Sequence, residues 1–503
     1  MSGEDVETLG TAVARHATAH PDQIAIRVSD GYLCYGELDA VASRVARSLH
    51  REGITAGDTV AALASASLPY LALMVGAARA NVVLAPLPAS AGTEAIAAML
   101  ADSGARLLFA DEAFAISAGS GVPVVDLRPT SWERWLAREM TALAQAPAAA
   151  GEPTTIIYSS GTTGTPKGIV QPHAYRSAMM KGAEARGYGP DAVTLLATPL
   201  YSNTTLASLL QTLGAGGTAV LMPKFEAGQW LKLAQELHVT HAMLVPVMYQ
   251  RLLAHPDFAR TDLSSFRMKF CTSAPFAAAL KREVLDRWPG GLTELYGMTE
   301  GGATFVLRAH EHPDKLHTVG QAVPGSEVRI LDADDRDVPP GGQGEIVGRS
   351  TGMMIGYHNR PDATAEGRWV APDGTVWQRT GDIGSLDADG FLTILDRKKD
   401  MIISGGFNIY PSDIEALLAQ NVAIEEASVV GVPSMAWGET PVVFAVAPGE
   451  EPDAIRLWLN ARLGRMQRVA DVVLVDSLPR GSIGKVLKRE LRDRYVAKCG
   501  MAD

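Results

Sequence analysis

The run SRVARSLHREGITAGDTVAAL at residues 43–63 sets the pattern that decides the fold, a helix followed by a buried strand. Residues 43–52 have helical spacing of apolar side chains, and TVAAL at 59–63 is a short, β-branched apolar run. Two further helix–strand pairs follow, at residues 71–80 with 82–85 and at residues 94–102 with 106–110. This alternation predicts a layered α/β domain with a largely parallel sheet.

The alternation of predicted helices and strands continues in the middle of the chain and then gives way to a series of short strands. Further strands are predicted at residues 219–222, 241–245 and 267–272. After about residue 320, short strands separated by turn signals predict a small β-rich subdomain, at residues 327–331, 344–347, 375–379 and 391–395. The remainder predicts a small α+β unit, with helices at residues 412–420 and 453–463 and strands at 427–432 and 442–447. The charged run at residues 396–400 separates a large N-terminal domain, 1–396, from a small C-terminal domain, 397–503.

Composition narrows the class of protein. Of 503 residues, 47% are hydrophobic and 20% charged, which excludes a disordered chain. The net charge of −11 argues against nonspecific nucleic-acid binding, which needs basic surfaces. The most apolar segment, Tyr70 to Leu87, is interrupted by Arg79, Asn81 and Pro86, so no membrane span is expected. Three scattered cysteines and an acidic N-terminus without an apolar stretch predict a cytoplasmic protein.

The strongest chemical signal is YSSGTTGTPKG at residues 158–168. Glycines let the backbone approach a ligand closely, and successive N–H groups, hydroxyls and one lysine suit phosphate oxygens. The run is not the usual P-loop, because no Gly-Lys-Ser/Thr triplet ends it. A Ser- and Gly-rich surface turn is the alternative.

A second signal is ELYGMTEGG at residues 294–302. A carboxylate beside a hydroxyl and glycines can hold Mg²⁺ together with a phosphate, because Mg²⁺ prefers oxygen ligands and shares them with substrate. The alternative is a helix that begins at Thr299, with Glu300 in its first turn.

Two more signals lie towards the C-terminus. Asp382, in RTGD at residues 379–382, could accept two hydrogen bonds from a ribose diol, although an Asp in a turn is the alternative. Lys485, in PRGSIGKV at residues 479–486, would by itself be read as a solvated surface lysine.

Together and in this order, from YGEL at residues 35–38 to Lys485, these segments resemble the acyl-adenylate-forming ligases. That superfamily contains acyl-CoA synthetases, peptide-synthetase adenylation domains and beetle luciferases, and the resemblance is closest to the acyl-CoA and aryl-CoA synthetase branch. It implies two half-reactions. A carboxylate attacks the α-phosphorus of ATP to give an acyl-adenylate and pyrophosphate, and a thiol, usually that of coenzyme A, then displaces AMP.

The resemblance also implies roles for individual residues. Around the β- and γ-phosphates it places Ser160, Gly161, Thr162, Thr163, Gly164 and Lys167. At the adenine it places Ser273, Ala274, Pro275, Glu294, Leu295, Tyr296 and Gly297. Asp382 and Arg397 would hold the ribose. Thr299 would contact the α-phosphate, and Glu300 would ligate Mg²⁺. Lys485 would act as a compact charge between the incoming carboxylate and the α-phosphate.

In this family the C-terminal domain rotates between the half-reactions, so domain closure assembles the site. The hinge position falls on Lys399. The resemblance implies that Ser404, Gly405 and Gly406 line the pantetheine tunnel. Trp437 would lie near the CoA nucleotide, with a purely structural tryptophan as the alternative.

The acyl pocket is expected to involve Tyr201, Ser202, Asn203, Thr204, Val245, Gly301 and Gly302. Ser202 stands where the family usually has a histidine, which puts in doubt the gating or carboxylate-holding role at this position. The lack of an Asp between residues 199 and 210 argues against an amino-acid substrate, and apolar or small walls without Arg or Lys argue against a dicarboxylate. A medium- or long-chain fatty acid and a phenylpropenoic acid both remain open.

The expected partners are therefore a small carboxylic acid and CoA, with ATP and Mg²⁺. Loading of a carrier-protein phosphopantetheine is the alternative acceptor. A nucleotide-binding protein without turnover is a further alternative, against which Lys485 and Glu300 weigh. The sequence leaves the oligomeric state, monomer or homodimer, open.

Overall fold

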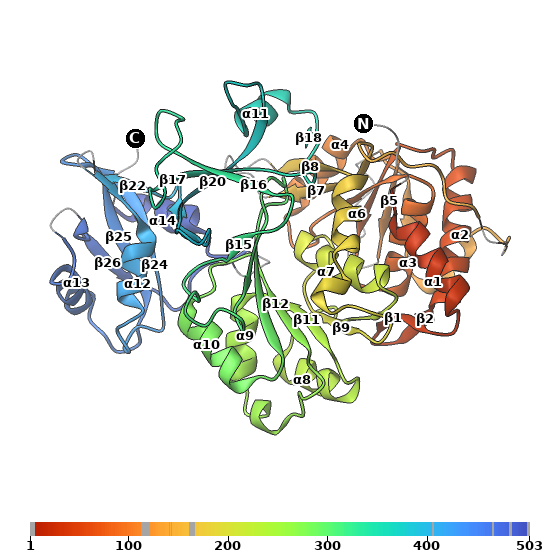
Figure 1. Ribbon diagram of the computed structural model, residues 1–503, viewed down its shortest axis with the longest axis horizontal. Coiled ribbons are helices and arrows are strands. Elements are labelled where there is room, and N and C mark those ends of the chain that lie inside the picture. The colour runs from red at the N-terminus through yellow and green to blue at the C-terminus, as the bar shows by residue number, and fades with distance from the viewer. Residues whose placement is uncertain are drawn as a thin grey trace. The chain divides into compact units, whose positions relative to one another are not determined.

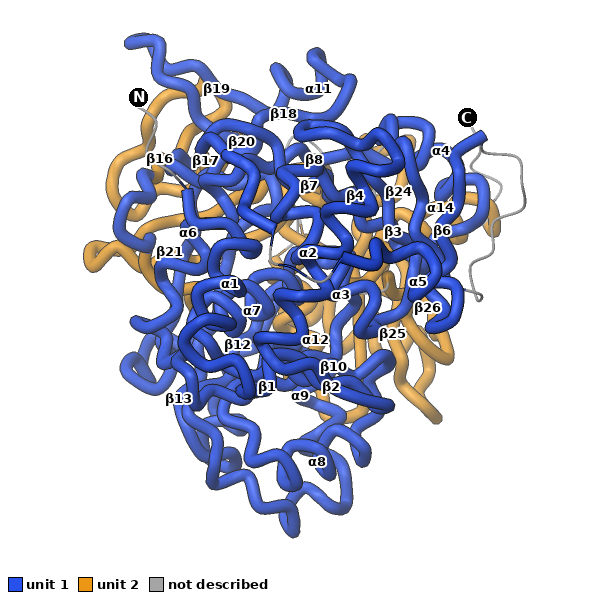
Figure 2. Tube along the Cα trace, turned by 90° about the vertical axis from the view of Figure 1, so that its right-hand side faces the viewer, with its two compact units in different colours: residues 1–317, 322–327, 348–378 blue, residues 318–321, 328–347, 379–503 orange. Residues whose placement is uncertain are grey.

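The computed structural model describes residues 6–111, 121–139, 141, 143–159, 166–404, 407–464, 467–481 and 485–499. Packing divides the chain into two compact units, which Figure 2 shows in different colours. The first comprises residues 1–317, 322–327 and 348–378, and the second comprises residues 318–321, 328–347 and 379–503. The boundary that we predict between residues 396 and 397 falls inside the second unit and stays a prediction.

A seven-stranded sheet contains the segment that opened the sequence analysis. Its order is β18-β8-β7-β4-β3-β5-β6. The bounds are β3 (Thr59–Leu63), β4 (Val83–Pro86), β5 (Leu107–Ala110), β6 (Val124–Asp126), β7 (Pro153–Ser159), β8 (Lys167–Pro172) and β18 (Gly356–Tyr357). Strands β6, β5, β3, β4 and β7 pair in parallel, whereas β8 and β18 are antiparallel. The parallel core confirms the prediction from residues 43–110.

A nine-stranded sheet has the order β15-β14-β13-β12-β11-β9-β10-β1-β2. The bounds are β1 (Ile24–Val28), β2 (Gly31–Cys34), β9 (Val193–Leu196), β10 (Thr218–Leu221), β11 (His241–Leu244), β12 (Met268–Cys271), β13 (Gly291–Tyr296), β14 (Phe305–Arg308) and β15 (Gln321–Ala322). Strands β1, β10, β9, β11, β12 and β13 run parallel. The order places β9, β11, β12 and β13 side by side, as Figure 1 shows for the first three.

Helices pack on these sheets, and one hydrophobic cluster joins residues of both sheets with residues of α1, α2, α3, α5, α6 and α7. The bounds are α1 (Leu9–Ala19), α2 (Tyr35–Arg51), α3 (Leu68–Arg79), α4 (Thr93–Ser103), α5 (Pro129–Trp135), α6 (His173–Lys181), α7 (Asn203–Gly214), α8 (Ala227–Glu236), α9 (Pro246–Leu253) and α10 (Ala278–Arg287). Short 3₁₀ turns lie at Glu184–Arg186 and Phe258–Arg260. Helix α3 is apolar nearly all round and is buried, and it confirms the helix predicted at residues 71–80.

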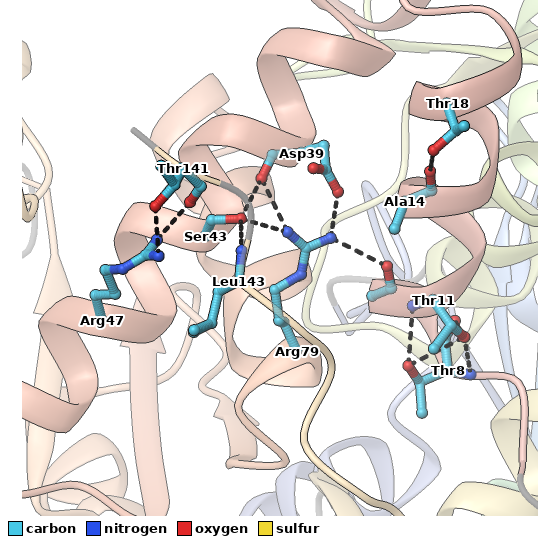
Figure 3. A network of polar contacts seen from close by, with 11 residues as sticks. Thr8, Thr11, Ala14, Thr18, Asp39, Ser43, Arg47, Arg79, Thr141 and Leu143 are labelled. Atoms are coloured by element: carbon cyan, nitrogen blue, oxygen red, sulfur yellow. Dashed lines mark hydrogen bonds and ion pairs between the residues drawn. The ribbon is translucent and has the colours of Figure 1, made fainter. Parts of the chain in front are cut away.

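Arg79 joins the first three helices at the last turn of α3 (Figure 3). Its buried guanidinium donates to the Ser43 hydroxyl at 2.6 Å and to the backbone oxygens of Asp39 and Gly10, and it pairs with the Asp39 carboxylate. Because both Nη atoms find acceptors and a carboxylate lies beside them, the cost of burying this charge is reduced.

The β-rich part that we predict after residue 320 forms a five-stranded sheet with the order β16-β17-β20-β19, and β21 pairs with β20. The bounds are β16 (Glu327–Leu331), β17 (Gly344–Arg349), α11 (Pro361–Glu366), β19 (Arg368–Val370), β20 (Val376–Leu386) and β21 (Leu392–Arg397). Strand β20 has eleven residues and extends well beyond the predicted 375–379. Antiparallel pairing with β21 carries it past Gly381, which adopts φ +69°.

The end of the chain is the predicted α+β arrangement. Its sheet has the order β23-β22-β25-β24, and β26 pairs in parallel with β25. The bounds are β22 (Ile402–Ser404), β23 (Phe407–Ile409), α12 (Pro411–Leu418), β24 (Glu426–Ser434), β25 (Gly438–Val446), α13 (Pro452–Asn460), β26 (Asp471–Leu474) and α14 (Lys488–Cys499). Two apolar clusters pack on the sheet. No helix in the described ranges combines the length and the apolar character that crossing a bilayer requires.

Candidate functional site

The predicted nucleotide and acyl segments follow four neighbouring parallel strands. Residues 197–202 follow β9, Val245 follows β11, the run 272–277 follows β12, and residues 297–302 follow β13. Because the carboxyl ends of parallel neighbours meet at one edge of a sheet, these segments lie together there. The fold thus brings the predicted adenine slot and the predicted acyl wall to one place.

A hydroxyl pair joins the two predicted regions directly. Thr204, in the first turn of α7, lies 2.6 Å from Ser273 between the side-chain oxygens. Ser273 adopts φ +80°, an uncommon conformation for a residue with a side chain, whereas Ala274 and Pro275 follow without such strain. The contact connects the end of β12 to the N-terminus of α7.

Ser202 is the N-cap of α7. Its hydroxyl accepts the backbone N–H of Thr204 at 3.3 Å, and the residue is almost fully buried. Serine is among the preferred N-cap residues, so a local structural requirement accounts for it at this position. Nearby, the Tyr201 and Ser90 hydroxyls lie 3.0 Å apart on the exposed side.

Glu294 is buried inside the sheet rather than turned to an open surface. Its carboxylate pairs with Lys281 of α10, whose amine also donates to the Leu316 carbonyl at 2.7 Å. Burial raises the pKa of Glu294 to about 7, and Lys281 opposes that rise. The pair connects β13 to α10, and the place of Glu294 at the adenine stays a prediction. Further along β13, Tyr296 is half-buried, with its ring centroid 6.0 Å from that of Phe305.

The segment Met298–Glu300 is a turn held from several sides, and no helix begins there. Gln171 donates to the Thr299 carbonyl at 2.8 Å, and the Tyr175 hydroxyl donates to the Met298 carbonyl at 3.4 Å. The Glu300 carbonyl accepts the Met354 N–H at 2.8 Å. These bonds reject the helix-cap alternative for Thr299.

Tyr357 fixes the Glu300 carboxylate. Its hydroxyl donates to Oε1 at 2.8 Å, and burial together with the Glu300 charge raises the pKa of Tyr357, so it stays a donor. Oε2 takes no hydrogen bond from any residue that the structure describes. Lys167, at the start of β8, places its amine 5.1 Å from the Tyr357 ring centroid. The other residues predicted at the phosphates, Ser160, Gly161, Thr162, Thr163 and Gly164, lie outside the described residues.

This carboxylate fits the expected magnesium ion. Mg²⁺ usually takes one or two protein carboxylates and completes its shell with water and substrate phosphate. Glu300 is partly exposed and presents one oxygen of this kind. In the described part of the chain, no group of three or more His, Cys, Asp or Glu side chains could hold a metal by itself.

Two glycines follow Glu300 in a crowded setting. Gly301 and Gly302 adopt φ +82° and +97°, which favour glycine. A Cβ on Gly301 would lie 1.9 Å from the Gly352 carbonyl oxygen, so the segment packs backbone against backbone. Val245, also predicted at the acyl wall, is buried.

The second unit gathers the predicted ribose residues and the predicted adenylation lysine. Asp382 and Arg397 are register partners across β20 and β21, and Arg397 Nε lies 3.4 Å from Asp382 Oδ1. The Lys485 carbonyl accepts the Gly481 N–H at 2.8 Å, and Arg480 and Val486 form an antiparallel bridge. Burial lowers the pKa of Lys485 to about 8, assisted by the charges of Arg397 and Lys399.

Lys399 lies in the turn between β21 and β22, where Lys398 donates its N–H to the Gly381 carbonyl at 2.8 Å. Ser404 is buried at the end of β22 and pairs with Gly438, the residue after the half-exposed Trp437. The structure thus brings these two predicted CoA residues together, while Gly405 and Gly406 lie outside the described residues.

Known proteins match the chain over nearly its whole length. The family model described as AMP-binding enzyme matches residues 13–358, and the model of the AMP-binding enzyme C-terminal domain matches residues 413–485. The chain belongs to the AMP-binding enzyme family. A feruloyl-CoA synthase of an Amycolatopsis species is 35% identical to this AMP-binding enzyme, over 97% of the chain and 99% of the relative.

Two other matches are similar in extent. The fatty acid–[acyl-carrier-protein] ligase ScoC of Streptomyces coeruleorubidus is 32% identical to this AMP-binding enzyme over 97% of each chain. The crystal structure of ATP-bound MatB from Rhodopseudomonas palustris superposes with a TM-score of 0.88 at 30% identity, over 97% of this chain and 99% of that one. These findings confirm the predicted membership among adenylate-forming ligases and the predicted fold class.

Sequence reasoning missed the residues that hold Met298–Glu300 in place. Gln171 and Tyr175 come from β8 and α6, and Tyr357 comes from β18. Each lies more than 50 residues from the segment that it supports, and none stands in a glycine-rich or charged run. The only sequence signal for these residues is indirect: a polar turn at a sheet edge needs hydrogen-bond partners, and those partners come from adjoining elements.

Proposed function

We propose that this AMP-binding enzyme is an ATP-dependent carboxylic acid–CoA ligase that forms an acyl-adenylate and then an acyl-CoA. The observation that carries the proposal is the edge where β9, β11, β12 and β13 end, with Glu300 braced there by Tyr357 and one carboxylate oxygen left for a ligand. The family match over both parts of the chain supports it.

In the first half-reaction, a carboxylate oxygen of the acid attacks the α-phosphorus of ATP. An O–P bond forms, and the bond to pyrophosphate breaks. We assign Thr299 to the α-phosphate, Tyr296 to the adenine, and Asp382 with Arg397 to the ribose. Lys167 and the loop before it take the β- and γ-phosphates. Mg²⁺, when bound beside Glu300, neutralises phosphate charge.

Lys485 has the central part in this step. Its ammonium neutralises charge that develops between the attacking carboxylate and the α-phosphate, a contribution that matters most in the transition state. In the second half-reaction, a thiol attacks the acyl carbon, a C–S bond forms, and AMP leaves as the C–O bond breaks. We assign Ser404, Gly405, Gly406 and Trp437 to the thiol donor.

The acid that we propose is apolar. Small or apolar residues form the assigned walls, and each buried CH₂ contributes about 0.8 kcal/mol. A fatty acid and a phenylpropenoic acid both remain candidates. The feruloyl-CoA synthase is named for a phenylpropenoic acid, whereas ScoC is named for a fatty acid. A panel of carboxylic acids assayed for AMP release with CoA tests the proposal, and it fails if no acid in the panel releases AMP.

One relative favours a second acceptor. ScoC is described as an acyl-carrier-protein ligase, so we keep transfer to a carrier-protein phosphopantetheine as the alternative. Parallel assays with CoA and with a phosphopantetheinylated carrier protein decide between the two. Faster transfer to the carrier protein would replace CoA in the proposal and leave the adenylation step unchanged.

A variant of Lys485 tests the division of labour between the half-reactions. Lys485→Ala is expected to lower ATP–pyrophosphate exchange by about 10²-fold or more, because the charge that it supplies is used in adenylation. Thioester formation from a preformed acyl-adenylate should stay close to that of the wild type. Survival of both half-reactions in this variant would show that the assigned role is wrong.

A further inference from the structure

Arg176 carries a buried charge for which the described part of the chain supplies no counter-ion. It lies on α6, is 6% exposed, and has no carboxylate within 4 Å among the described residues. Its Nε and Nη2 donate to the Thr155 hydroxyl at 3.3 and 3.2 Å, and Nη1 donates to Asn203 Oδ1 at 2.7 Å. Burial lowers the pKa of Arg176 to about 10, so the guanidinium stays charged at neutral pH.

The surroundings do not neutralise this charge. Arg176 lines a cavity of about 50 Å³ together with His173 and Glu7. Burial lowers the pKa of His173, so that ring is neutral, and Glu7 pairs with Arg15 at 2.8 Å. A cavity of this size has room for one or two water molecules, and no carboxylate among the described residues pairs with the cation.

Arg176 determines how the Asn203 amide is oriented. A guanidinium has only donors, so Asn203 must turn Oδ1 towards it. The amide nitrogen then faces the other way, where Nδ2 donates to the Tyr175 hydroxyl at 3.1 Å. Tyr175 in turn donates to the Met298 carbonyl, two residues before Glu300. The amide donor therefore faces the segment assigned to the nucleotide and the metal.

Asn203 also occupies the first position of α7, next to the N-cap Ser202. Backbone N–H groups without helical partners and the positive end of the helix dipole favour an anion at this place. An uncompensated cation directly behind the same turn adds to that field. In a buried setting, such a charge is screened little by solvent.

We propose that Arg176 is a positioning residue for the carboxylate of the acid substrate, acting through Asn203 in the adenylation step. The inference rests on the proposed function. Arg176 keeps the Asn203 amide turned as a donor and supplies the positive field at the N-terminus of α7. The free acid carries a full negative charge, which this field attracts. The acyl group of the adenylate carries no charge. Arg176 therefore serves the first half-reaction and not the second.

The experiment compares Arg176→Met with the wild-type enzyme, using decanoate and ferulate as the acids. The KM for the better acid in ATP–pyrophosphate exchange should rise about tenfold, equivalent to about 1.4 kcal/mol. The KM for ATP should stay unchanged, and so should thioester formation from preformed decanoyl-AMP or feruloyl-AMP. Arg176→Lys, which keeps the charge but not the fork of donors, should give an intermediate KM.

A second variant tests the same point without removing the arginine. Asn203→Asp has nearly the same volume and supplies Arg176 with the missing counter-ion, so a well-folded protein is expected. It should raise the KM for the acid in the same selective way. Arg186→Met is the matched control, because Arg186 is a half-buried arginine that donates to an amide oxygen of α7, Gln211 Oε1, at 2.9 Å. It should leave the KM for the acid unchanged.

Three outcomes overturn the inference. An unchanged KM for the acid in Arg176→Met and Asn203→Asp would exclude the positioning role. Equal losses for acid, ATP and preformed adenylate would show that Arg176 is only structural. A wild-type enzyme that activates neither these acids nor any other in the panel would remove the proposed function itself, and the inference with it.

Discussion

Lys485 has its amine among other charged groups of the second unit. Burial is the largest influence on the pKa of Lys485 and lowers it; Arg397 and Lys399 lower it further, whereas Asp382 and Asp400 raise it. The net result is a lysine whose pKa, about 8, lies within reach of ordinary assay conditions. A group assigned to hold charge in adenylation is thus poised to lose its proton at mildly alkaline pH.

We therefore expect adenylation to be sensitive to alkaline pH. Because the pKa of Lys485 is lowered from 10.5 to about 8, the ammonium form predominates below pH 8 and is lost as the pH rises through that value. The kcat/KM of ATP–pyrophosphate exchange should fall above pH 8, since it reports ionisations of the free enzyme. A profile that stays level up to pH 10 would contradict the role of this ammonium.

Individual residues were predictable where they stand in a run with chemical meaning. The sequence assigns Asp382, Arg397 and Lys485 to one site, and the structure places Arg397 Nε 3.4 Å from Asp382 Oδ1 and Lys485 within electrostatic influence of both. Their roles stay predictions. Tyr357 and Arg176 were not predictable, because each acts through one hydrogen bond to a residue far along the chain. Such partnerships depend on how helices and strands stack, which residue types alone do not encode.

Among the elements, the first three helices depend on a single buried side chain. The Arg79 guanidinium bonds to α1 and α2 from the end of α3, and the Asp39 carboxylate is its counter-ion (Figure 3). These helices pack against both large sheets through the common core. Loss of this side chain should therefore weaken the first unit as a whole.

We expect Arg79→Met to lower the free energy of unfolding by about 3–5 kcal/mol, as when one partner of a buried ion pair is removed. The midpoint of urea unfolding, followed by tryptophan fluorescence, measures the effect. Lys232→Met is the control, because its pair with Glu236 is exposed at 3.9 Å and should contribute less than about 1 kcal/mol. Equal shifts for the two variants would contradict the importance assigned to the buried pair.

Most elements were predictable from hydrophobic period. Strand β3 matches its predicted range, residues 59–63, and β16 matches 327–331. Two lengths were misjudged: β20 runs on because β21 pairs with it, and α2 begins at Tyr35, earlier than the predicted residue 43. Its start is set by a Glu37 carboxylate that accepts the Cys34 N–H at 2.8 Å, a capping bond that the periodic pattern alone did not reveal.

At the scale of the whole molecule, the chain divides into units whose limits do not follow the sequence in order. Residues 318–321 and 328–347 belong to the second unit by packing, although residue 396 is the boundary that charge and apolar runs suggest. Strand β20 begins in the first unit and ends in the second. A domain boundary drawn from charged and apolar runs in the sequence cannot reveal a strand that is shared in this way. The hinge at Lys399 remains a proposal.

The hinge proposal has a direct test. Lys399→Pro should leave ATP–pyrophosphate exchange close to the wild-type rate and block thioester formation from preformed acyl-adenylate, because proline fixes φ at the pivot. The comparison variant is Lys398→Ala, which retains backbone freedom next to the pivot and should support both half-reactions. Equal loss of both steps in Lys399→Pro would contradict the hinge assignment.

The close approach of Gly301 to Gly352 bears on how the range of acids could be redesigned. A methyl group at residue 301 would collide with the Gly352 carbonyl and displace the segment whose Met354 N–H bonds to the Glu300 carbonyl. A larger side chain there would displace Glu300, which we assign to Mg²⁺, before it changed the shape of the proposed acyl pocket. Mutant libraries that aim at the choice of acid should therefore spare this glycine.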